Sequence, residues 1–443
     1  MTSPHPTSPQ QQADHTVRTV LGQLPILTHR GLVVDSPPGA GKTTLAAQAA
    51  ATLARSAPCI VIAQTNNQVD ELLKRLARLH PDLRLARLTA EDHNIPADLH
   101  SLPGLRISTS IKGLEKRDVI AGTAMKWATV TDRTWPWAVI DEVYQMRSDL
   151  LLRTAPLFDK ALFVGDPGQL DPFSAADTHR WAGLPHDPLA NAVTVLLDNN
   201  RDLPLHTLPA SWRLPPSAIP LVGKAFYPLT PFHAGHPETN RTLAFAATGI
   251  RSPLDKTIDH AARTGWALLE LPARFTHRLD TEALHAAAAL AERLLIRHAA
   301  ITCEDHPQGR DLEPRDIAIG TVHRDQARRI RALLAHDPRL HAVTVDTANR
   351  LQGREFSVTI ALHPLSGRSD ASAFHLEAGR LCVLTTRHRH ACIVIARAGI
   401  DQLLDAHGSN GPVHLGVTSK IPDSWGAHHT VLEHLAPHTI GAR

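Results

Sequence analysis

The stretch VVDSPPGAGKTTLAAQAA, residues 33–50, constrains the fold more than any other part of this 443-residue chain. An apolar run ends at Asp35, a short loop rich in glycine and proline follows, and a helical pattern begins after Gly41. Backbone N–H groups around Gly39 and Gly41 can approach phosphate oxygens closely, and the start of a helix favours an anion. The order strand, loop, helix therefore predicts a phosphate-binding loop, with Ser36 where its first glycine usually stands.

Side chains suited to a nucleotide and a metal ion flank this loop. We expect Lys42 to reach the β- and γ-phosphates and Thr43 to place its hydroxyl on Mg²⁺. Asp141 and Glu142 follow the apolar run WAVI, and the carboxyl end of a parallel strand lies near the phosphate loop. Asp141 suits Mg²⁺ through its water shell, and Glu142 suits a general base or an orienter of water. The expected nucleotide-binding set is Pro38, Gly39, Ala40, Gly41, Lys42, Thr43 and Thr44.

Short apolar runs alternate with helical patterns along both halves of the chain, which predicts an α/β fold with parallel sheets covered on both faces. The first series of strand patterns is 31–35, 59–64, 118–123, 137–142 and 161–166. The second is 265–272, 316–322, 342–347, 356–363 and 392–397, with helical patterns at 280–299 and 324–335. We expect a disordered leader at 1–25, a first domain at 26–203 with a short insertion near 80–117, and a second domain at 204–443. The stretch 228–262 reads as loop.

Composition narrows the class of protein without deciding its function. Hydrophobic residues make up 43% and charged residues 20%, as in globular proteins, and no apolar run reaches the roughly 18 residues of a membrane span. The net charge of +3 permits a nucleic-acid partner without requiring one, and 4% aromatic residues leave room for only a small base-stacking surface. The four cysteines suggest buried free thiols in a reducing cytoplasm. A zinc site at Cys382, His388, His390 and Cys392 is a weak alternative, because their spacing matches no usual finger.

Six further motifs follow in a fixed order. They are AQTNNQVDELL (63–73), DEVYQ (141–145), VGDPGQLDP (164–172), LPASWRLPPSAIPLVGKAFY (208–227), TVDTANRLQGREFSVTI (344–360) and GRLCVLTTRHRHACIVI (379–395). With the phosphate loop, this series resembles the superfamily 1 helicases, most closely their 5′-to-3′ branch, over residues 31–397. The resemblance implies two RecA-like P-loop domains, ATP and Mg²⁺ as cofactors, and single-stranded DNA or RNA as partner.

The resemblance also implies roles for the residues that would handle ATP. Gln169 resembles the glutamine that senses the γ-phosphate, and Arg213 and Arg387 resemble two arginines that the second domain presents to it. With Lys42 and Glu142 they form the expected catalytic set. A planar cation fits the charge that develops during phosphoryl transfer.

Other matched positions imply contacts to ribose, base and strand. Gln352, Gly353 and Glu355 resemble the motif that binds the ribose and the strand backbone across the domain cleft, and Gln12 resembles the glutamine that reads adenine. The expected nucleic-acid contacts are Thr65, Asn66, Thr123, Arg324 and Gln352. For Arg324, a charged helix start explains the residue almost as well. His388 and Arg389 beside Arg387 read as a solvated basic edge.

These motifs predict a cytoplasmic, ATP-dependent helicase or translocase, with no membrane segment and with protein partners undefined. The short segment near 80–117 weakens the expectation of strand separation, because relatives often place a small barrel there. An ATP-gated binding switch that hydrolyses ATP without unwinding is therefore the alternative. A small-molecule P-loop kinase is a third class, which the motifs from Gln169 onward disfavour.

Overall fold

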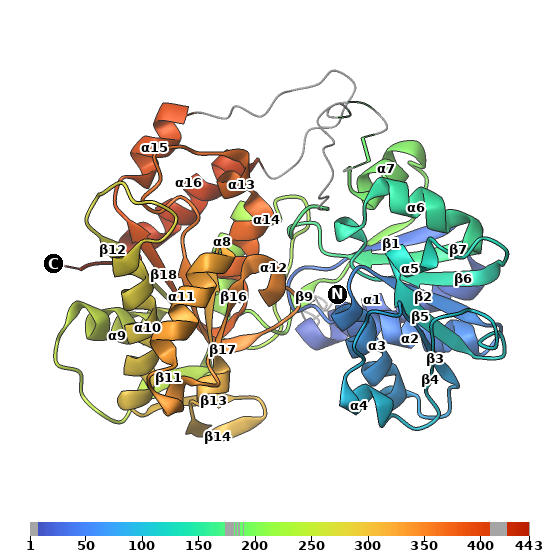
Figure 1. Cartoon of the computed structure of the whole chain (residues 1–443), viewed down its shortest axis with the longest axis horizontal. Helices are drawn as coiled ribbons and strands as arrows, with labels where there is room; N and C mark the ends of the chain where they lie inside the picture. Colours follow the sequence, from blue (N-terminus) through green and yellow to red (C-terminus); the bar gives the residue numbers. More distant parts are fainter. Residues whose placement is uncertain are drawn as a thin grey trace, which may run out of the picture. The chain divides into compact units, whose positions relative to one another are not determined.

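The computed structural model describes residues 8–172, 181, 184, 187, 188, 190–407 and 423–442. The chain separates into two compact units (Figure 1). Unit 1 holds most residues up to Ala210, and unit 2 holds residues 168–170 and most residues from Ser211 onward. The predicted α/β class is confirmed, because a large parallel sheet flanked by helices lies in each unit.

Unit 1 is built on a parallel sheet with the strand order β4-β3-β5-β2-β6-β7-β1-β8. Its strands are β1 (Gly31–Asp35), β2 (Cys59–Ala63), β3 (Leu85–Leu88), β4 (Arg106–Ser108), β5 (Val119–Thr123), β6 (Trp135–Ile140), β7 (Phe158–Gly165) and β8 (Leu205–Thr207). The phosphate-loop strand β1 lies between β7 and β8. The domain boundary expected between residues 203 and 204 thus lies directly before β8, which is a strand of the first sheet.

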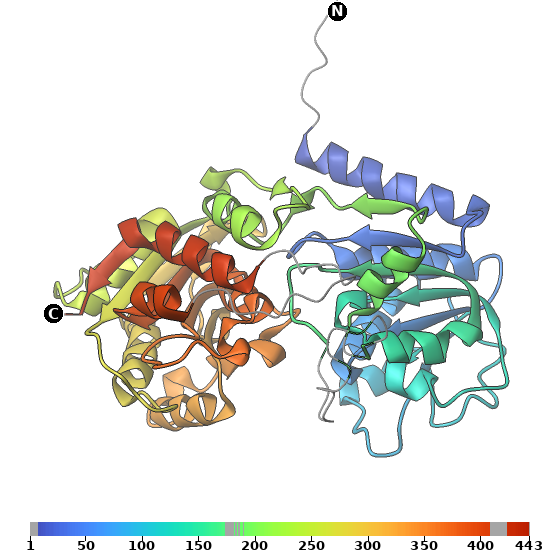
Figure 2. The same cartoon turned by 90° about the horizontal axis from the view of Figure 1, so that it is seen from above.

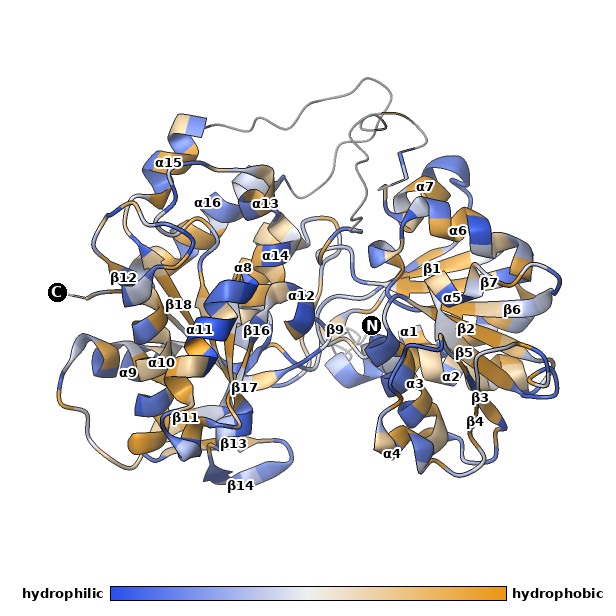
Figure 3. Cartoon of the chain, viewed as in Figure 1, coloured by the Kyte–Doolittle hydropathy of each residue, from blue (hydrophilic) through white to orange (hydrophobic). Residues whose placement is uncertain are grey.

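Alternate residues of these strands face two different apolar cores, as the pleat of a strand requires. On β1, Leu32 and Val34 pack with α1, α2 and α3, whereas Val33 packs with α5, α6 and α7 on the other face. Figure 3 shows mostly hydrophobic residues in the strands of this sheet and a mixture of hydrophilic and hydrophobic residues in the helices beside it. The helices are α1 (Pro9–Gln23), α2 (Lys42–Ala54), α3 (Asn66–Leu79), α4 (Ala97–His100), α5 (Ala124–Trp127), α6 (Ser148–Thr154) and α7 (Ala192–Asn199).

The expectation of a disordered leader is wrong for the described residues from Ser8 onward. They form helix α1, which runs along the edge of unit 1 beside β8 (Figure 2). Ser8 and Gln11 form a reciprocal capping box at its start, which satisfies two backbone N–H groups. Ala13 and Val20 are buried against the first core. The sequence did not predict this helix, because its polar glutamines leave too weak an apolar stripe to recognise.

The segment near 80–117 belongs to the sheet and is not a separate insertion. It supplies β3 and the edge strand β4, and β3 pairs with β5 in the interior of the sheet. Arg87 of β3 is fully buried, and its Nε donates to Asp70 of α3 at 2.8 Å. The sequence pattern did not predict this strand, because LRLARL contains two arginines. The buried ion pair of Arg87 interrupts the apolar run that is typical of an interior strand.

Unit 2 contains a second parallel sheet, with the order β16-β15-β17-β18-β12-β19, and an antiparallel sheet β11-β13-β14. The parallel strands are β12 (Trp266–Leu271), β15 (Ile317–Thr321), β16 (Thr344–Thr347), β17 (Phe356–Leu362), β18 (His388–Arg397) and β19 (Thr439–Gly441). The others are β9 (Ala210–Ser211), β10 (His233–Ala234), β11 (Thr242–Phe245), β13 (Ala299–Cys303) and β14 (His306–Asp311).

Helices also cover both faces of the second parallel sheet. On one face α9, α10 and α11 pack over residues such as Leu269 and Ile393, and on the other α8, α14, α15 and α16 pack over Leu268 and Val394. The helices are α8 (Ile219–Phe226), α9 (Pro253–Thr264), α10 (Thr281–Ile296), α11 (Arg324–Leu334), α12 (Ala348–Leu351), α13 (Ala373–Leu376), α14 (Ala378–Thr385), α15 (Ile400–His407) and α16 (Ser424–Leu435).

The loop expected at 228–262 is wrong in two places. Residues 242–245 form β11, which pairs antiparallel with β13, and residues from Pro253 form α9. Ser252 caps α9 by accepting from the N–H of Asp255, and proline occupies the first turn, where it costs no hydrogen bond. Among the described residues, no helix combines the length and the apolar character needed to cross a bilayer.

Candidate nucleotide and nucleic-acid sites

The phosphate loop of unit 1 has the backbone geometry that its sequence predicts. Gly39 and Gly41 adopt positive φ angles of 73° and 91°, which L-residues rarely tolerate. Gly41 is the N-cap of α2, so the first turn of that helix begins at Lys42. Ser36 does not have a positive φ, and its N–H donates to the carbonyl of Gly165 on β7 at 2.8 Å. Serine is therefore accommodated at the position of the usual glycine.

The predicted lysine and glutamate of the site lie in direct contact. Lys42 Nζ lies 2.5 Å from Glu142 Oε1, and both side chains are largely buried. The other oxygen, Glu142 Oε2, accepts from Gln145 Nε2 at 2.7 Å. Glu142 adopts a left-handed backbone with φ of 55°, a conformation that costs a non-glycine residue about 1–2 kcal/mol. The strand-end turn thus holds this carboxylate in a fixed direction, beside the lysine that would bind phosphate.

Three acidic groups act on this single lysine. Burial disfavours the charged form of Lys42, but Glu142, Asp141 and Asp166 outweigh burial and raise its pKa. Burial also raises the pKa of Asp141 to about 7, although Lys42 acts in the opposite direction. Asp35 at the end of β1 has a pKa raised to about 6, mainly by burial, while a hydrogen bond from Tyr144 lowers it. Tyr144 Oη donates to Asp35 Oδ1 at 2.6 Å.

These groups fit a nucleotide with a divalent cation. Two left-handed glycines expose backbone N–H groups at a helix start, which is a common phosphate site. Asp141 is a buried carboxylate, and its pKa stays raised although the Lys42 cation lowers it, so a further cation would stabilise its charged form. Mg²⁺ prefers such hard oxygen ligands. Thr43 lies in the first turn of α2 and can supply its hydroxyl. Thr44 has a different task, because its hydroxyl accepts a hydrogen bond from Arg75 of α3.

In unit 2, both arginines predicted to be catalytic are buried. Arg213 is 7% exposed and Arg387 is 1% exposed. Arg213 Nε donates to Glu355 Oε2 at 3.2 Å, and its Nη1 approaches the carbonyl of Thr386 at 3.5 Å. Arg387 Nη2 donates to the hydroxyl of the same Thr386 at 2.8 Å. Thr386 therefore contacts both guanidinium groups, and Glu355 joins them through its pair with Arg213.

The two glutamines predicted from separate motifs meet in unit 2. Gln352 Nε2 donates to Gln169 Oε1 at 2.7 Å. Gly353, directly after Gln352, has a φ of 78°, which explains why glycine stands in the motif LQGREF. Thus the structure brings Arg213, Arg387 and Glu355 together, and brings Gln169 to Gln352.

In unit 1, the residues predicted to contact the nucleic-acid strand also stabilise the fold. Thr65 and Thr123 are the N-caps of α3 and α5, and each hydroxyl accepts a backbone N–H at 3.3 Å. Asn66 Oδ1 accepts from the buried Arg87 at 2.8 Å. Gln12 lies on α1 of unit 1, where its backbone N–H donates to Ser8. Their roles toward nucleic acid and adenine stay predictions.

Arg324 begins helix α11 and lines a groove of about 220 Å³. The residues around the groove are mostly basic: Arg324, Asp325, Ala327, Arg328, Arg331, Asp346 and Arg350. Arg331 is engaged with the carbonyl of Val345 at 2.5 Å and with Asp346 at 3.4 Å. Since Arg324 and Arg328 are four residues apart, they share one face of the helix. This face presents cations to an anion such as a phosphodiester.

Three minor sequence interpretations can be compared with the structure. All four cysteines are buried thiols outside any disulfide, as expected. Among the described residues no group of three potential metal ligands occurs, so the weak zinc alternative has no support. The solvated basic edge is wrong: His388 is fully buried on β18, and Arg389 pairs with Glu304 at 2.9 Å.

Comparison with known proteins supports the class that the motifs define. Residues 285–399, about a quarter of the chain, match a family model described as an AAA domain. Together with the ordered motif series, this local match supports the resemblance to superfamily 1 helicases. No curated protein sequence matches the chain.

Solved structures with a similar arrangement include two viral helicases. One is the arterivirus nonstructural protein 10 helicase in complex with DNA, with 13% identity, a TM-score of 0.45, and coverage of 89% of this chain and 64% of that one. The other is the PRRSV helicase, with 14% identity, a TM-score of 0.41, and coverage of 95% of this chain and 70% of that one. The chain thus spans less than two thirds of the arterivirus protein's length.

Several residues of these sites escaped the sequence analysis. Tyr144, which donates to Asp35, and Arg241, which contacts the backbone beside Arg213, belong to no expected set. Tyr144 lies within the motif DEVYQ, so its position next to the acidic pair was a usable signal. Arg241 lies in the stretch read as loop and offered no signal.

Proposed function

We propose that this protein is an ATP-dependent translocase on single-stranded nucleic acid, moving in the 5′-to-3′ direction. The observation that carries the proposal is the pair Lys42–Glu142 beside Asp141 at a phosphate loop, on the same chain as a buried arginine pair. The family match and the motif order support the nucleic-acid partner. Free buried thiols are in keeping with a cytoplasmic location.

The mechanism proposed for unit 1 starts from the residues in contact. Backbone N–H groups of the loop and Lys42 would hold the phosphates, while Thr43 and Asp141 would hold the cation. When bound there, the cation would supply positive charge that offsets the phosphate charge in the transition state. Glu142, once Lys42 binds phosphate, is free to orient a water molecule and to accept its proton, and Gln145 keeps the carboxylate in place. The left-handed turn at Glu142 preorganises this arrangement.

Unit 2 would supply the cations that complete hydrolysis. We infer from the motifs that Arg213 and Arg387 stabilise the charge that develops on the γ-phosphate. Arginines in this role contribute about 10³-fold or more to the rate. Gln169 would couple the nucleotide state to the nucleic-acid contacts, and its hydrogen bond to Gln352 supports such a link.

The strand would be held mainly through its phosphates. The groove with Arg324 and Arg328 provides cations on one face of α11. His323, the N-cap of this helix, stacks on Phe374 with ring centroids 5.4 Å apart and 17° between planes. Phe374 is 44% exposed, but the Arg380 guanidinium also lies 3.9 Å from its ring centroid, so protein side chains already lie against this ring. The proposed grip therefore rests on contacts with phosphates. Contacts of this kind are indifferent to sequence and weaken with salt.

The decisive experiment is steady-state ATP hydrolysis without polymer, with single-stranded DNA, and with single-stranded RNA, each at two salt concentrations. Stimulation by one polymer that declines with salt supports the proposal and names the track. Equal turnover in every sample would refute it. The variant Lys42→Ala serves as the control for contaminating ATPases, because it removes the cation that holds the phosphates.

One observation favours an ATP-gated binding switch as a second candidate. Between β3 and β5 the structure holds only α4 and β4, so no barrel lies there to divide a duplex. Such a switch would hydrolyse ATP and bind strand without moving along it. A strand-displacement assay separates the two: ATP-dependent release of a duplex with a 5′ overhang supports the motor, and stimulated hydrolysis without release supports the switch.

A further inference from the structure

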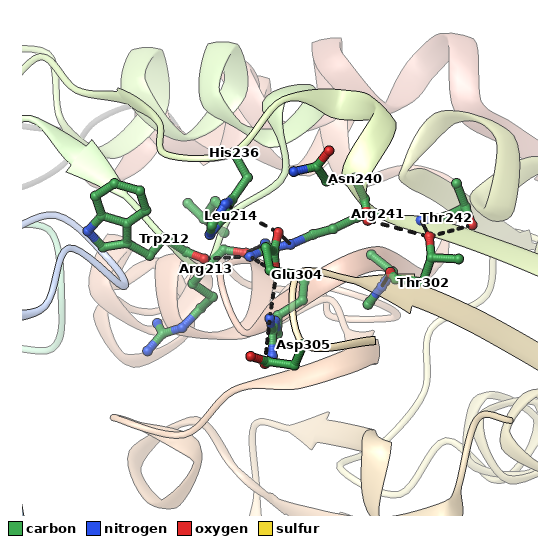
Figure 4. Close-up of polar contacts among 12 residues, drawn as sticks. Trp212, Arg213, Leu214, His236, Asn240, Arg241, Thr242, Thr302, Glu304 and Asp305 are labelled. Carbon is green, nitrogen blue, oxygen red and sulfur yellow. Dashed lines mark hydrogen bonds and ion pairs between the residues drawn. The ribbon is translucent and has the colours of Figure 1, made fainter. Parts of the chain in front are cut away.

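A buried arginine outside every helicase motif contacts the backbone that carries Arg213. Arg241 follows the short helical turn Glu238–Asn240 and is only 9% exposed. Its Nη1 donates to the carbonyl of Arg213 at 2.5 Å, and its Nη2 donates to the carbonyl of Trp212 at 2.6 Å (Figure 4). One guanidinium group therefore fixes two successive peptide units, including that of the residue predicted to act on phosphate.

A second layer of charges holds Arg241 itself. Glu304 accepts from Arg241 Nε at 2.8 Å and from Nη2 at 3.2 Å, a bidentate pair with planar geometry. The same carboxylate pairs with Arg389 of β18 at 2.9 Å and with His236 at 3.4 Å. Partial burial raises the pKa of Glu304, but Arg241 outweighs burial and lowers it, so this group is an anion at neutral pH.

The antiparallel sheet of unit 2 places Glu304 in this position. Glu304 lies in the tight turn between β13 and β14, and β11 begins directly after Arg241. Opposite each other on β11 and β13, Thr242 and Thr302 share a hydroxyl hydrogen bond of 2.8 Å. His390 of β18 makes a 2.8 Å hydrogen bond with the carbonyl of Thr302, which anchors the hairpin to the parallel sheet. The antiparallel sheet thus holds Glu304 in the position from which it binds Arg241.

The loop around Arg213 is also fixed from its other side. The N–H of Leu214 donates to Ser211 Oγ at 3.1 Å, and the N–H of Gly235 donates to the carbonyl of Ser211 at 2.7 Å. Trp212 packs so closely on Gly235 that a Cβ there would lie 2.3 Å from the indole ring. Backbone rotation is therefore restricted on both sides, and the Arg213 side chain leaves the loop in one direction, toward Glu355.

We infer that Arg241 is a positioning residue for ATP hydrolysis: it sets the direction of the Arg213 guanidinium by holding the carbonyls of residues 212 and 213. This inference rests on the proposed function. A displacement of about 1 Å in a catalytic group can reduce turnover about 10²-fold. Arg241 itself needs no contact with nucleotide for this effect.

The test combines Arg241→Met with Arg213→Ala, measured as polymer-stimulated ATP hydrolysis. Arg241→Met removes the two backbone contacts but leaves Glu304 paired with Arg389 and His236, so no buried anion is orphaned. We expect kcat to fall about 10- to 100-fold with the KM for ATP within about twofold, because only the transition-state contact is displaced. If Arg241 acts through Arg213, the double variant is no slower than Arg213→Ala alone.

Two controls separate positioning from general loss of structure. Arg397→Met removes another buried arginine of unit 2, which contacts Asp280 at 2.6 Å and has no contact with the Arg213 loop. It is expected to lower thermal stability while kcat stays near the wild-type value. If Arg241→Met does not fold, Arg241→Lys replaces it, because lysine keeps a cation beside Glu304 but lacks the planar fork that reaches both carbonyls.

The outcomes are distinct. Wild-type kcat in the folded Arg241 variants, or losses that multiply in the double variant, would overturn the inference and leave the proposed function intact. Full turnover in Arg213→Ala would overturn the proposed role of Arg213, and the inference with it. The inference is supported if Arg241→Met lowers kcat on its own but causes no further loss when Arg213 is already replaced by alanine.

Discussion

The buried carboxyl of Asp35 predicts a large, pH-dependent gain in stability on neutralisation. Asp35 lies at the end of the phosphate-loop strand, is 7% exposed and has a pKa raised from 3.8 to about 6. Its Oδ1 accepts from Tyr144, and an asparagine oxygen can accept the same hydrogen bond. The substitution Asp35→Asn therefore removes a buried charge while it keeps the shape and the partner.

The magnitude follows from linkage. Below pH 3.8 the carboxyl is neutral in both the folded and the unfolded states. As pH rises, the unfolded chain ionises first, so the folded state loses stability until pH passes about 6. For pKa values of 3.8 and 6 the cost in the free energy of unfolding is about 1.6 kcal/mol at pH 5 and about 3 kcal/mol at pH 8. Asp35→Asn should raise the free energy of unfolding by these amounts. Its stability advantage over the wild type should therefore be about 1.4 kcal/mol larger at pH 8 than at pH 5.

Denaturant unfolding of both proteins at pH 5 and pH 8, followed by far-UV circular dichroism and without nucleotide, measures this gap. Tyr144→Phe is the matched control, because it removes the hydrogen bond that lowers the Asp35 pKa; it should therefore destabilise the protein more at pH 8 than at pH 5. An Asp35→Asn advantage that is absent at pH 8, or equal at both pH values, would refute the reasoning.

Four further predictions concern the catalytic groups, one distant ion pair and one buried thiol. Arg387→Ala should keep ATP binding but lose about 10³-fold in hydrolysis, measured by equilibrium binding and steady-state turnover; unchanged turnover would exclude a catalytic role. Because Asp141 must ionise to hold Mg²⁺ and its pKa is raised to about 7, hydrolysis at low Mg²⁺ should rise as pH increases from 6 to 8; a flat profile would contradict this role. Arg397→Met, which leaves Asp280 buried without its main cation, should destabilise the protein by about 3–5 kcal/mol in a denaturant titration. Native Cys59, whose burial raises its thiol pKa to about 12, should resist iodoacetamide until the chain unfolds.

Local patterns predicted the framework of the site because its chemistry depends on short sequence order. The phosphate loop needs a strand before it and a helix after it, and β1 and α2 begin and end almost where the pattern places them. The acidic pair at 141–142 follows β6 for the same reason. Apolar interior strands such as β17 are continuous hydrophobic runs, which periodicity identifies directly.

The features that the sequence did not predict depend mostly on polar contacts between residues far apart in the chain. The pair Arg87–Asp70 joins β3 to α3, and Arg241 meets a carboxylate 63 residues away. Such partners have no fixed spacing, so a single sequence gives no signal for them. Helix α1 failed for a different reason: its stability comes from a capping box and two buried contacts, and its composition is that of a polar tail.

The carboxylates near Lys42 bear on which form of a triphosphate could bind at the proposed nucleotide site. Asp141, Glu142 and Asp166 supply three acidic groups against one ammonium group. A triphosphate arriving without a counter-ion brings several more negative charges into the same low-dielectric space, where repulsion is strong. A triphosphate that carries its divalent ion instead cancels part of the charge already present. If the proposed function holds, this strand end would favour binding of the metal complex over the bare nucleotide, before any chemistry begins.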